Sequence, residues 1–163
     1  TGTIPQGNVA NASLGAVTAL PAAIATGTVL QVVQAITTTA VTHVSDGGQV
    51  DTTLTASITP SATSSKILVL IERGGAVLLN YELRLFRDST NIEYWDSVCA
   101  EECQNDGSFY GSNHAYHYQD SPSSTSALVY KTTGRIVSSG GGRTVAFQNG
   151  SAPSTMTLME IAG

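Results

Sequence analysis

The sequence predicts an all-β protein, an antiparallel, jelly-roll-like β-sandwich of about 8–9 strands that follows an extended N-terminal arm. Three observations predict it. Ser and Thr make up 39 of the 163 residues, Gly adds 16 and Lys occurs only twice, so strong helix formers are scarce. Apolar and polar residues alternate with period two in several runs. Turn-forming residues separate these runs at spacings of roughly 10–15 residues.

The composition excludes several classes of protein. Only 12% of the residues are charged and the net charge is −5, which excludes a basic nucleic-acid binder and a charged coiled coil. The hydrophobic fraction of 41% is too high for a disordered chain of modest net charge. No apolar run reaches the roughly 18 residues that a membrane-spanning helix needs. Neither nucleic acid nor a membrane is therefore expected as a partner.

Charge is distributed unevenly along the chain. The first 45 residues contain no Asp, Glu, Lys or Arg, and all 19 charges lie between Asp46 and Glu160. Residues 1–27 are small and show no helical or strand period, so they cannot build a core of their own. We expect residues 1–27 to form an arm that lies against its own domain or a neighbouring subunit, because burying it desolvates no ion. A flexible linker is the alternative. Residues 28–163 then form the sandwich domain.

The strands are predicted from residue 29 onward. Residues 50–58 alternate between apolar and polar side chains, as in a strand with one buried face. Residues 67–71 are continuously apolar, which predicts a strand covered on both faces. Residues 77–86 also alternate, which favours a strand over the alternative of a helix across 76–88. The other strands are expected at 29–38, 92–95, 127–132, 134–138, 143–148 and 155–161, and the aromatic-rich segment 109–118 is compatible with one more.

An irregular excursion over residues 97–108 holds both cysteines. Cys99 and Cys103 are a candidate disulfide, with free thiols as the alternative, and closure requires their Cα atoms to approach within about 7 Å. Together with His114 and His117 they come close to a zinc-binding spacing. Two histidines three positions apart on a strand point to opposite faces, however, so we expect no zinc site.

Motifs for other metals, cofactors and catalysis are missing. No D-x-D-x-D-G pattern accompanies the acids of this region, which favours a solvated loop over a calcium site. No G-x-S-x-G elbow, P-loop or H-E-x-x-H occurs, so we expect no cofactor and no enzymatic activity. The acids concerned are Glu101, Glu102, Asp106 and Asp120.

Aromatic residues are concentrated in one region. Six of the ten Phe, Trp and Tyr residues fall between residues 94 and 118. An aromatic ring stacks on the apolar face of a sugar while nearby polar groups orient its hydroxyls, so the region predicts a glycan-contact surface. Alternatively, every second ring of a strand fills the core. The glycan-contact candidates are Trp95, Tyr110, Asn113, Tyr116, His117 and Tyr118.

Three segments resemble the β-sandwich domains of tailed-bacteriophage structural proteins, which occur in tail-fibre tips and other virion appendages. They are residues 27–34 (GTVLQVVQ), residues 54–69, which include SITPSATSSK, and residues 156–163 (MTLMEIAG). The excursion from Cys99 to Asp120 is not part of the resemblance.

The resemblance implies a structural virion protein, a homotrimeric fibre or appendage module located in the virion that contacts the host surface. It implies no catalytic residues, and its partners would be other virion proteins and possibly a host surface polysaccharide. A capsid-decorating protein is the nearest alternative, because it would share the fold and the trimer. A carbohydrate-binding or sugar-modifying protein is the alternative from another class.

Overall fold

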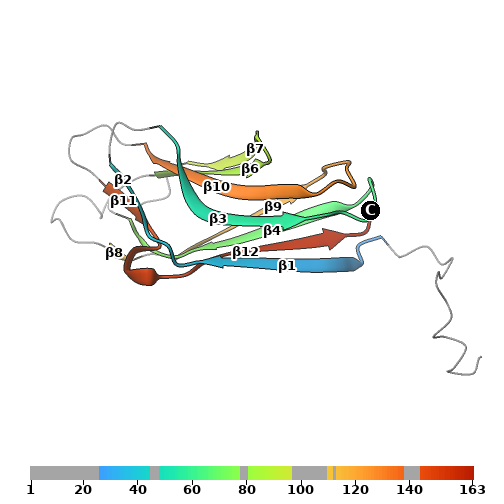
Figure 1. The fold of residues 1–163 in the computed structure, drawn as a ribbon, viewed down its shortest axis with the longest axis horizontal. Coiled ribbons are helices and arrows are strands. Elements are labelled where there is room, and N and C mark those ends of the chain that lie inside the picture. Colours follow the sequence, from blue (N-terminus) through green and yellow to red (C-terminus); the bar gives the residue numbers. More distant parts are fainter. Residues whose placement is uncertain (1–25, 45–47, 78–80, 97–109, 112, 138–143) are drawn as a thin grey trace, which may run out of the picture.

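A computed structural model describes residues 26–44, 48–77, 81–96, 110–111, 113–137 and 144–163 (Figure 1). These residues form twelve β-strands and one short 3-10 turn without any α-helix, so the predicted all-β class is confirmed. Within the same ranges, no helix is long and apolar enough to cross a membrane. The elements are β1 (Val29–Thr37), β2 (Val41–Val44), β3 (Val50–Ile58), β4 (Lys66–Arg73), β5 (Ala76–Val77), β6 (Tyr81–Arg87), β7 (Thr90–Trp95), β8 (Tyr110–Gly111), β9 (His114–Asp120), β10 (Leu128–Ile136), β11 (Thr144–Phe147), the 3-10 turn η2 (Asn149–Ser151) and β12 (Ser154–Ile161).

Eight of the strands form two antiparallel sheets that pack against each other (Figure 1). Sheet I has the order β1-β12-β4-β9 and sheet II the order β3-β10-β6-β7. The remaining short strands form sheet III, in the order β2-β11-β5-β8. Each strand of sheet III adjoins a strand of sheet I along the chain and keeps its place in the order, so sheets I and III are two parts of one bent sheet. When β1 and β2, β4 and β5, β8 and β9, and β11 and β12 are each counted as one strand, the chain has eight strands. Numbered along the chain, these strands are ordered 1-8-3-6 in one sheet and 2-7-4-5 in the other, which is a jelly roll, as predicted.

Two glycines lie at the bend between β4 and β5. Gly75 has a φ of +127°, a backbone conformation that glycine adopts far more readily than other residues. A Cβ atom on Gly74 would lie 2.3 Å from the carbonyl oxygen of Pro153, so no side chain fits there. The Gly74 N–H also donates a hydrogen bond of 3.0 Å to the Ser154 hydroxyl. The connection from β11 to β12 therefore packs directly on the bend.

The hydrophobic core lies between sheets I and II. Alternate residues of the long strands point into it, as the period-two pattern predicts, and Leu54, Leu83 and Leu158 are each no more than 2% exposed. The other core side chains are Ala56, Ile58, Ile67, Val69, Ile71, Tyr81, Leu85, Tyr116, Leu128, Tyr130, Val145, Phe147 and Met156.

The apolar run of β4 is buried on one face only. Ile67, Val69 and Ile71 point into the core, whereas Leu70 is 38% exposed and Leu68 is half-buried. The prediction of a strand covered on both faces is therefore wrong for the single chain, because sheet II covers only the inner side of sheet I.

Four predicted strand segments are divided or joined differently in the structure. The predicted strand 77–86 is divided, because β5 belongs to sheet III and β6 to sheet II. The segment 109–118 is divided in the same way into β8 and β9. Conversely, 127–132 and 134–138 form the single strand β10, whose bulge opposite β3 accommodates the irregularity. Gly134 lies inside this strand, and a larger residue would not fit there because its Cβ atom would lie 2.2 Å from the Phe147 ring.

Residues 1–25 of the predicted arm lie outside the described residues. Next to them, the Gly27 N–H donates a hydrogen bond of 2.7 Å to the Ala162 carbonyl oxygen, and the Ala162 N–H donates one of 2.8 Å to Thr28. Backbone hydrogen bonding between β1 and β12 thus continues to residue 27, the last residue of the predicted arm.

Candidate functional site

The outer face of sheet I carries very little charge. Alternate residues of its four strands point away from the core and form rows across the sheet. Among the described residues of this face, only Lys66 and Glu72 are acidic or basic apart from histidine, and they stand at opposite ends of β4. The first row is Val29, Ile161 and Lys66, the second is Val32, Met159, Leu68 and Gln119, the third is Gln34, Thr157, Leu70 and His117, and the fourth is Ile36, Thr155, Glu72 and Ala115.

The apolar side chains of this face are well exposed. Val29, Val32 and Ile36 on β1 are 47%, 53% and 62% exposed, and Leu70 on β4 adds to them. β1 is an edge strand of sheet I and contains neither a charged residue nor proline, the usual means by which edge strands avoid pairing. The outer face of sheet I is therefore a candidate contact surface.

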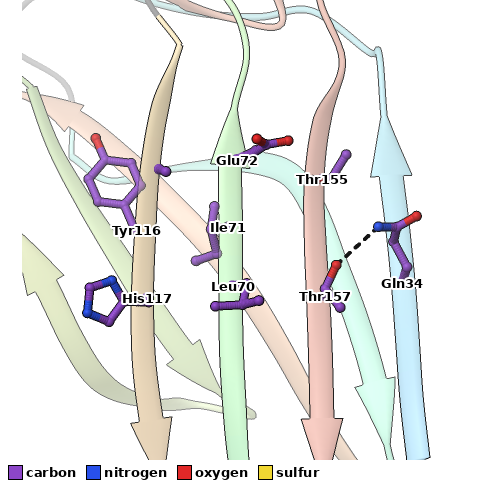
Figure 2. Close-up of a pocket in the computed structure, with 9 residues that line it drawn as sticks. Gln34, Leu70, Ile71, Glu72, Tyr116, His117, Thr155 and Thr157 are labelled. Atoms are coloured by element: carbon purple, nitrogen blue, oxygen red, sulfur yellow. Dashed lines mark hydrogen bonds between the residues drawn. The ribbon is translucent and has the colours of Figure 1, made fainter.

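A shallow hollow lies over the third and fourth rows of this face (Figure 2). Leu70 lies on its floor, and the Gln34 side-chain amide donates a hydrogen bond of 3.1 Å to the Thr157 hydroxyl across β1 and β12. Glu72 and His117 are exposed and supply its ionisable groups. The hollow therefore combines an apolar floor with a few polar groups, a combination suited to packing and hydrogen bonding. Ile71, Ala115, Tyr116 and Thr155 complete the lining.

The outer face of sheet II is charged instead. The Glu82 carboxylate is ion-paired with Arg84 and accepts hydrogen bonds of 2.9 Å from Arg135 and 2.7 Å from Gln49. Burial by itself raises the pKa of Glu82, but the hydrogen bonds from the two arginines outweigh it, so the pKa is lowered. Sheet II thus meets solvent with a network of ion pairs that sheet I does not have on its described outer face.

Glu160 on β12 is fully buried and is held by neutral donors. Ser61 donates from its backbone N–H at 2.7 Å and from its hydroxyl at 2.6 Å, the Ser65 hydroxyl donates at 2.7 Å and the Gln31 amide at 2.6 Å. Burial by itself raises the pKa of this carboxyl, but these hydrogen bonds outweigh it and lower the pKa to about 2. Glu160 therefore stays ionised and fixes the loop before β4 to the last strand.

Asp120 on β9 joins the two sheets. Its carboxylate accepts hydrogen bonds of 2.8 Å and 2.7 Å from Arg87 on β6 and one of 2.7 Å from the Tyr130 hydroxyl on β10. Burial by itself lowers the pKa of Arg87, but the bonded Asp120 outweighs it and the pKa is raised. Burial, and then the hydrogen bond to Asp120, raise the pKa of Tyr130. Asp120 is thus committed to the interior of the fold.

A neutral polar cluster lies at the end of β9. The Tyr81 hydroxyl is hydrogen-bonded to the Tyr116 hydroxyl and lies 2.9 Å from Nδ1 of His114. Burial, and then the charge of Arg73, lower the pKa of His114, while burial and Tyr81 raise the pKa of Tyr116. Both shifts favour the neutral forms, so the cluster packs as an uncharged network rather than as an acid–base pair.

Three of the predicted glycan-contact residues point into the sandwich. Tyr116 is buried, and Trp95 packs on it with the ring centroids 4.9 Å apart. Tyr118 points the same way from β9 and packs against the core. The alternative interpretation therefore holds for these rings, which fill the interior. Residues 116 and 118 share the inner face of β9, and Trp95 of β7 pairs with the core residue Leu83 of β6.

The other three candidates are separated from those rings. His117 lies on the outer face, in the hollow, and Asn113 is exposed just before β9. Tyr110 lies in β8, where its backbone pairs with Val77. The six candidates are not gathered on one exposed surface, so a glycan site could use at most some of them.

The cysteine and metal predictions fall mostly outside the described residues. Cys99 and Cys103 lie there, so their disulfide stays a prediction. His114 and His117 do point to opposite faces of β9, one toward Tyr81 and the other into the hollow. Within the described ranges, no group of three or more His, Cys, Asp or Glu residues could hold a metal ion. Glu101, Glu102 and Asp106 also lie outside these ranges.

Two features of the site have weak signals in the sequence. Ser61 and Ser65 stand in the segment that carries the resemblance, but their acceptor Glu160 lies 99 and 95 residues further along the chain. The outer face of sheet I does have a signal in the continuous apolar run 67–71, which predicts cover on both sides without saying what supplies it.

The strand order defines an antiparallel jelly-roll domain, and the sparsely charged outer face of sheet I is its candidate contact surface. No protein-family model matches the chain, and no curated protein matches it. Among solved structures, the chain is similar to the infectious bursal disease virus VP2 subviral particle, with 12% identity and a TM-score of 0.46 over 82% of this chain and 33% of that chain.

Two further structures show comparable likeness. The structure of the infectious bursal disease virus Gx strain matches with 12% identity and a TM-score of 0.43 over 82% of this chain and 34% of that chain. Dimeric latent PorU from Porphyromonas gingivalis matches with 9% identity and a TM-score of 0.38 over 86% of this chain and 14% of that chain. The chain thus spans about a third or less of these proteins. Likeness at this level assigns neither family nor function, and the jelly roll rests on the strand order itself.

Proposed function

We propose that the chain is a structural virion protein that assembles with identical copies of itself, as a trimeric fibre or appendage module of a tailed bacteriophage. The observation that carries the structural role is the exposed outer face of sheet I, which carries only Lys66 and Glu72 as charged residues among those described, whereas the outer face of sheet II carries a network of ion pairs. Such a face is covered when copies assemble. The uncharged residues 1–27 lead directly into β1 and offer a second element that a neighbouring copy can bury without desolvating an ion.

The phage assignment rests on the sequence resemblance of three segments, which meet at one point of the fold. Gln31 belongs to residues 27–34, Ser61 and Ser65 belong to residues 54–69, and Glu160 belongs to the last segment. All four side chains are joined by hydrogen bonds at the Glu160 carboxylate. The segments that carry the resemblance are therefore parts of one structural unit, as expected of a scaffold rather than of a catalytic site, and we propose no enzymatic role.

The trimer is tested by the mass of the purified full chain, measured by size-exclusion chromatography with light scattering. We expect three chains per particle or a multiple of three, and deletion of residues 1–27 should weaken the association. A chain that stays monomeric across micromolar concentrations would overturn the assembly role.

The position in the virion is tested separately, by electron microscopy of particles that carry a labelled copy of the chain. Label on a fibre or appendage supports the proposal, whereas label spread over the capsid identifies a capsid-decorating protein instead. Contact with a host polysaccharide is tested on a glycan array with wild-type protein and the His117→Ala variant, because His117 is the predicted contact residue that lies exposed in the hollow.

A further inference from the structure

We propose that two copies of the chain pack outer face on outer face through sheet I, in a two-fold arrangement that places Lys66 of one copy opposite Glu72 of the other. The inference rests on the proposed function, because it supposes that copies assemble. It deepens that function by naming the surface through which they meet, the occupant of that surface and the register of the contact.

The charges of the face are complementary to an inverted copy. Lys66 and Glu72 point outward from the two ends of β4, and the described residues between them on this face are uncharged. A two-fold axis that lies in the interface and runs across the strands reverses the order of the rows and sets each strand over its own counterpart. Lys66 of each copy then faces Glu72 of the other. A copy whose β4 ran in the same direction would instead place Lys66 level with Lys66 and Glu72 level with Glu72, which is repulsive.

Glu72 is available for such a contact. Its side chain is exposed at the rim of the hollow. The Lys66 ammonium donates one hydrogen bond of 3.0 Å to the Ser121 hydroxyl and has further donors to offer. Both groups lie at the margins of the face, so they can direct the register while the apolar rows between them supply the packing.

The apolar rows fit the same operation. It places the second row over the third, so Leu68 faces Leu70 of the other copy, and it places the first row over the fourth, so Val29 faces Ile36. The hollow lies in the third and fourth rows, and it therefore faces the first two rows, which hold Ile161, Met159 and Leu68. Each copy thus offers a hollow at one end of the face and apolar side chains at the other.

The area of the face is sufficient for a specific contact. Strands of about eight residues are about 26 Å long, and four of them side by side are about 19 Å wide. Each copy then contributes roughly 500 Å², and the pair buries roughly 1,000 Å², which is near the lower limit for a biological interface. The affinity of this contact is therefore expected to be low, and single substitutions should be enough to disrupt it.

The decisive measurement compares Leu70→Lys with Val129→Lys by light scattering of the full chain. Leu70 is 38% exposed on the outer face of sheet I, and Val129 is 40% exposed on that of sheet II, so the two variants are matched in exposure and charge. We expect Leu70→Lys to halve the particle mass, for example from six chains to three, and Val129→Lys to leave it unchanged. An unchanged mass in Leu70→Lys overturns the proposal, provided that circular dichroism shows both variants folded.

The register is tested by charge reversal. Lys66→Glu and Glu72→Lys should each weaken the pairing by at least roughly tenfold, because two attractive pairs become repulsive. The double variant Lys66→Glu/Glu72→Lys should recover wild-type pairing to within about threefold, because it exchanges the two charges. If the losses of pairing affinity in the two single variants simply add in the double variant, the two residues do not face each other, and the two-fold register is overturned.

The outcomes separate this inference from the proposed function. A wild-type mass that is not a multiple of three, but is halved by Leu70→Lys, keeps the face contact and rejects the trimer. A mass of three chains that Leu70→Lys leaves unchanged keeps the trimer and rejects the face contact. If Leu70→Lys leaves the mass unchanged and abolishes binding to a glycan array, the face binds carbohydrate and the proposed self-association is wrong.

Discussion

The two long sheets of the sandwich have similar inner faces and very different outer faces. Inside, both contribute alternating aliphatic and aromatic side chains to one core. Outside, sheet II surrounds Glu82 with Arg84 and Arg135, whereas sheet I exposes valine, isoleucine and leucine and places Lys66 and Glu72 only at the ends of β4. Folding does not require this difference, because sheet II shows that a charged outer face is compatible with the same core.

The buried carboxylates follow the same division. Glu82 of sheet II is held by arginines, while Glu160 of sheet I is held by serine hydroxyls, a backbone N–H and a glutamine amide. Asp120 lies where the sheets meet and combines an arginine with a tyrosine hydroxyl. Both sheets therefore bury carboxylates together with hydrogen-bond donors, and the difference in charge between the sheets lies on their outer faces.

The largest effect on stability is expected at Asp120, where the two sheets are joined. Asp120→Ala leaves the Arg87 guanidinium without its buried partner, which should lower the free energy of unfolding by about 3–5 kcal/mol. Urea denaturation measures it. Asp51→Ala is the control, because Asp51 is exposed and 3.8 Å from Lys131, and it should lose less than about 1 kcal/mol. Equal losses in the two variants would contradict the role of Asp120.

Stability should also depend on pH through Glu160. The pKa of this carboxyl is lowered from 4.5 to about 2 on folding, so its contribution is complete above pH 4.5 and is lost as the pH falls toward 2. The expected loss is roughly 3 kcal/mol. Unfolding curves from pH 6 to pH 2 of wild type and Glu160→Gln measure it.

Glu160→Gln should be less stable at neutral pH and should have a flatter pH profile, because the titrating group is gone. Parallel profiles for the two proteins would assign the acid sensitivity to other groups and would contradict the role of Glu160.

The smallest effect is expected on the outer face of sheet II. Glu82→Gln should cost about 1 kcal/mol, because the side chains of Arg84 and Arg135 are 31% and 42% exposed and water replaces part of the interaction. This contribution should shrink as NaCl is raised from about 0.05 M to about 1 M. The loss caused by Glu160→Gln should change less with salt, because its donors are neutral. Equal salt dependence in both variants would remove the distinction between the sheets.

Period-two alternation was sufficient to predict the fold class and much of the core. Leu54, Ala56 and Ile58 were expected on one face of their strand and are buried there, and Tyr81, Leu83 and Leu85 likewise. The same pattern could not predict that residues 77 and 81 belong to different sheets, because alternation along the sequence does not mark where one strand ends and the next begins. The candidate site was predicted less well. The aromatic cluster suggested a surface, but Trp95 and Tyr116 pack on each other inside.

The sequence by itself determined that this chain forms sheets, where most of its turns lie and that its first 45 residues are free of charge, since these follow from local residue preferences and spacing. Only the tertiary structure decided that Ser61, Ser65 and Gln31 converge on Glu160, and that Val32, Met159 and Leu68 lie side by side on one outer face. The physical reason is that these contacts join residues from 91 to 129 positions apart in the sequence. Such long-range pairing depends on the energy of the whole sheet and leaves no local signal in the chain.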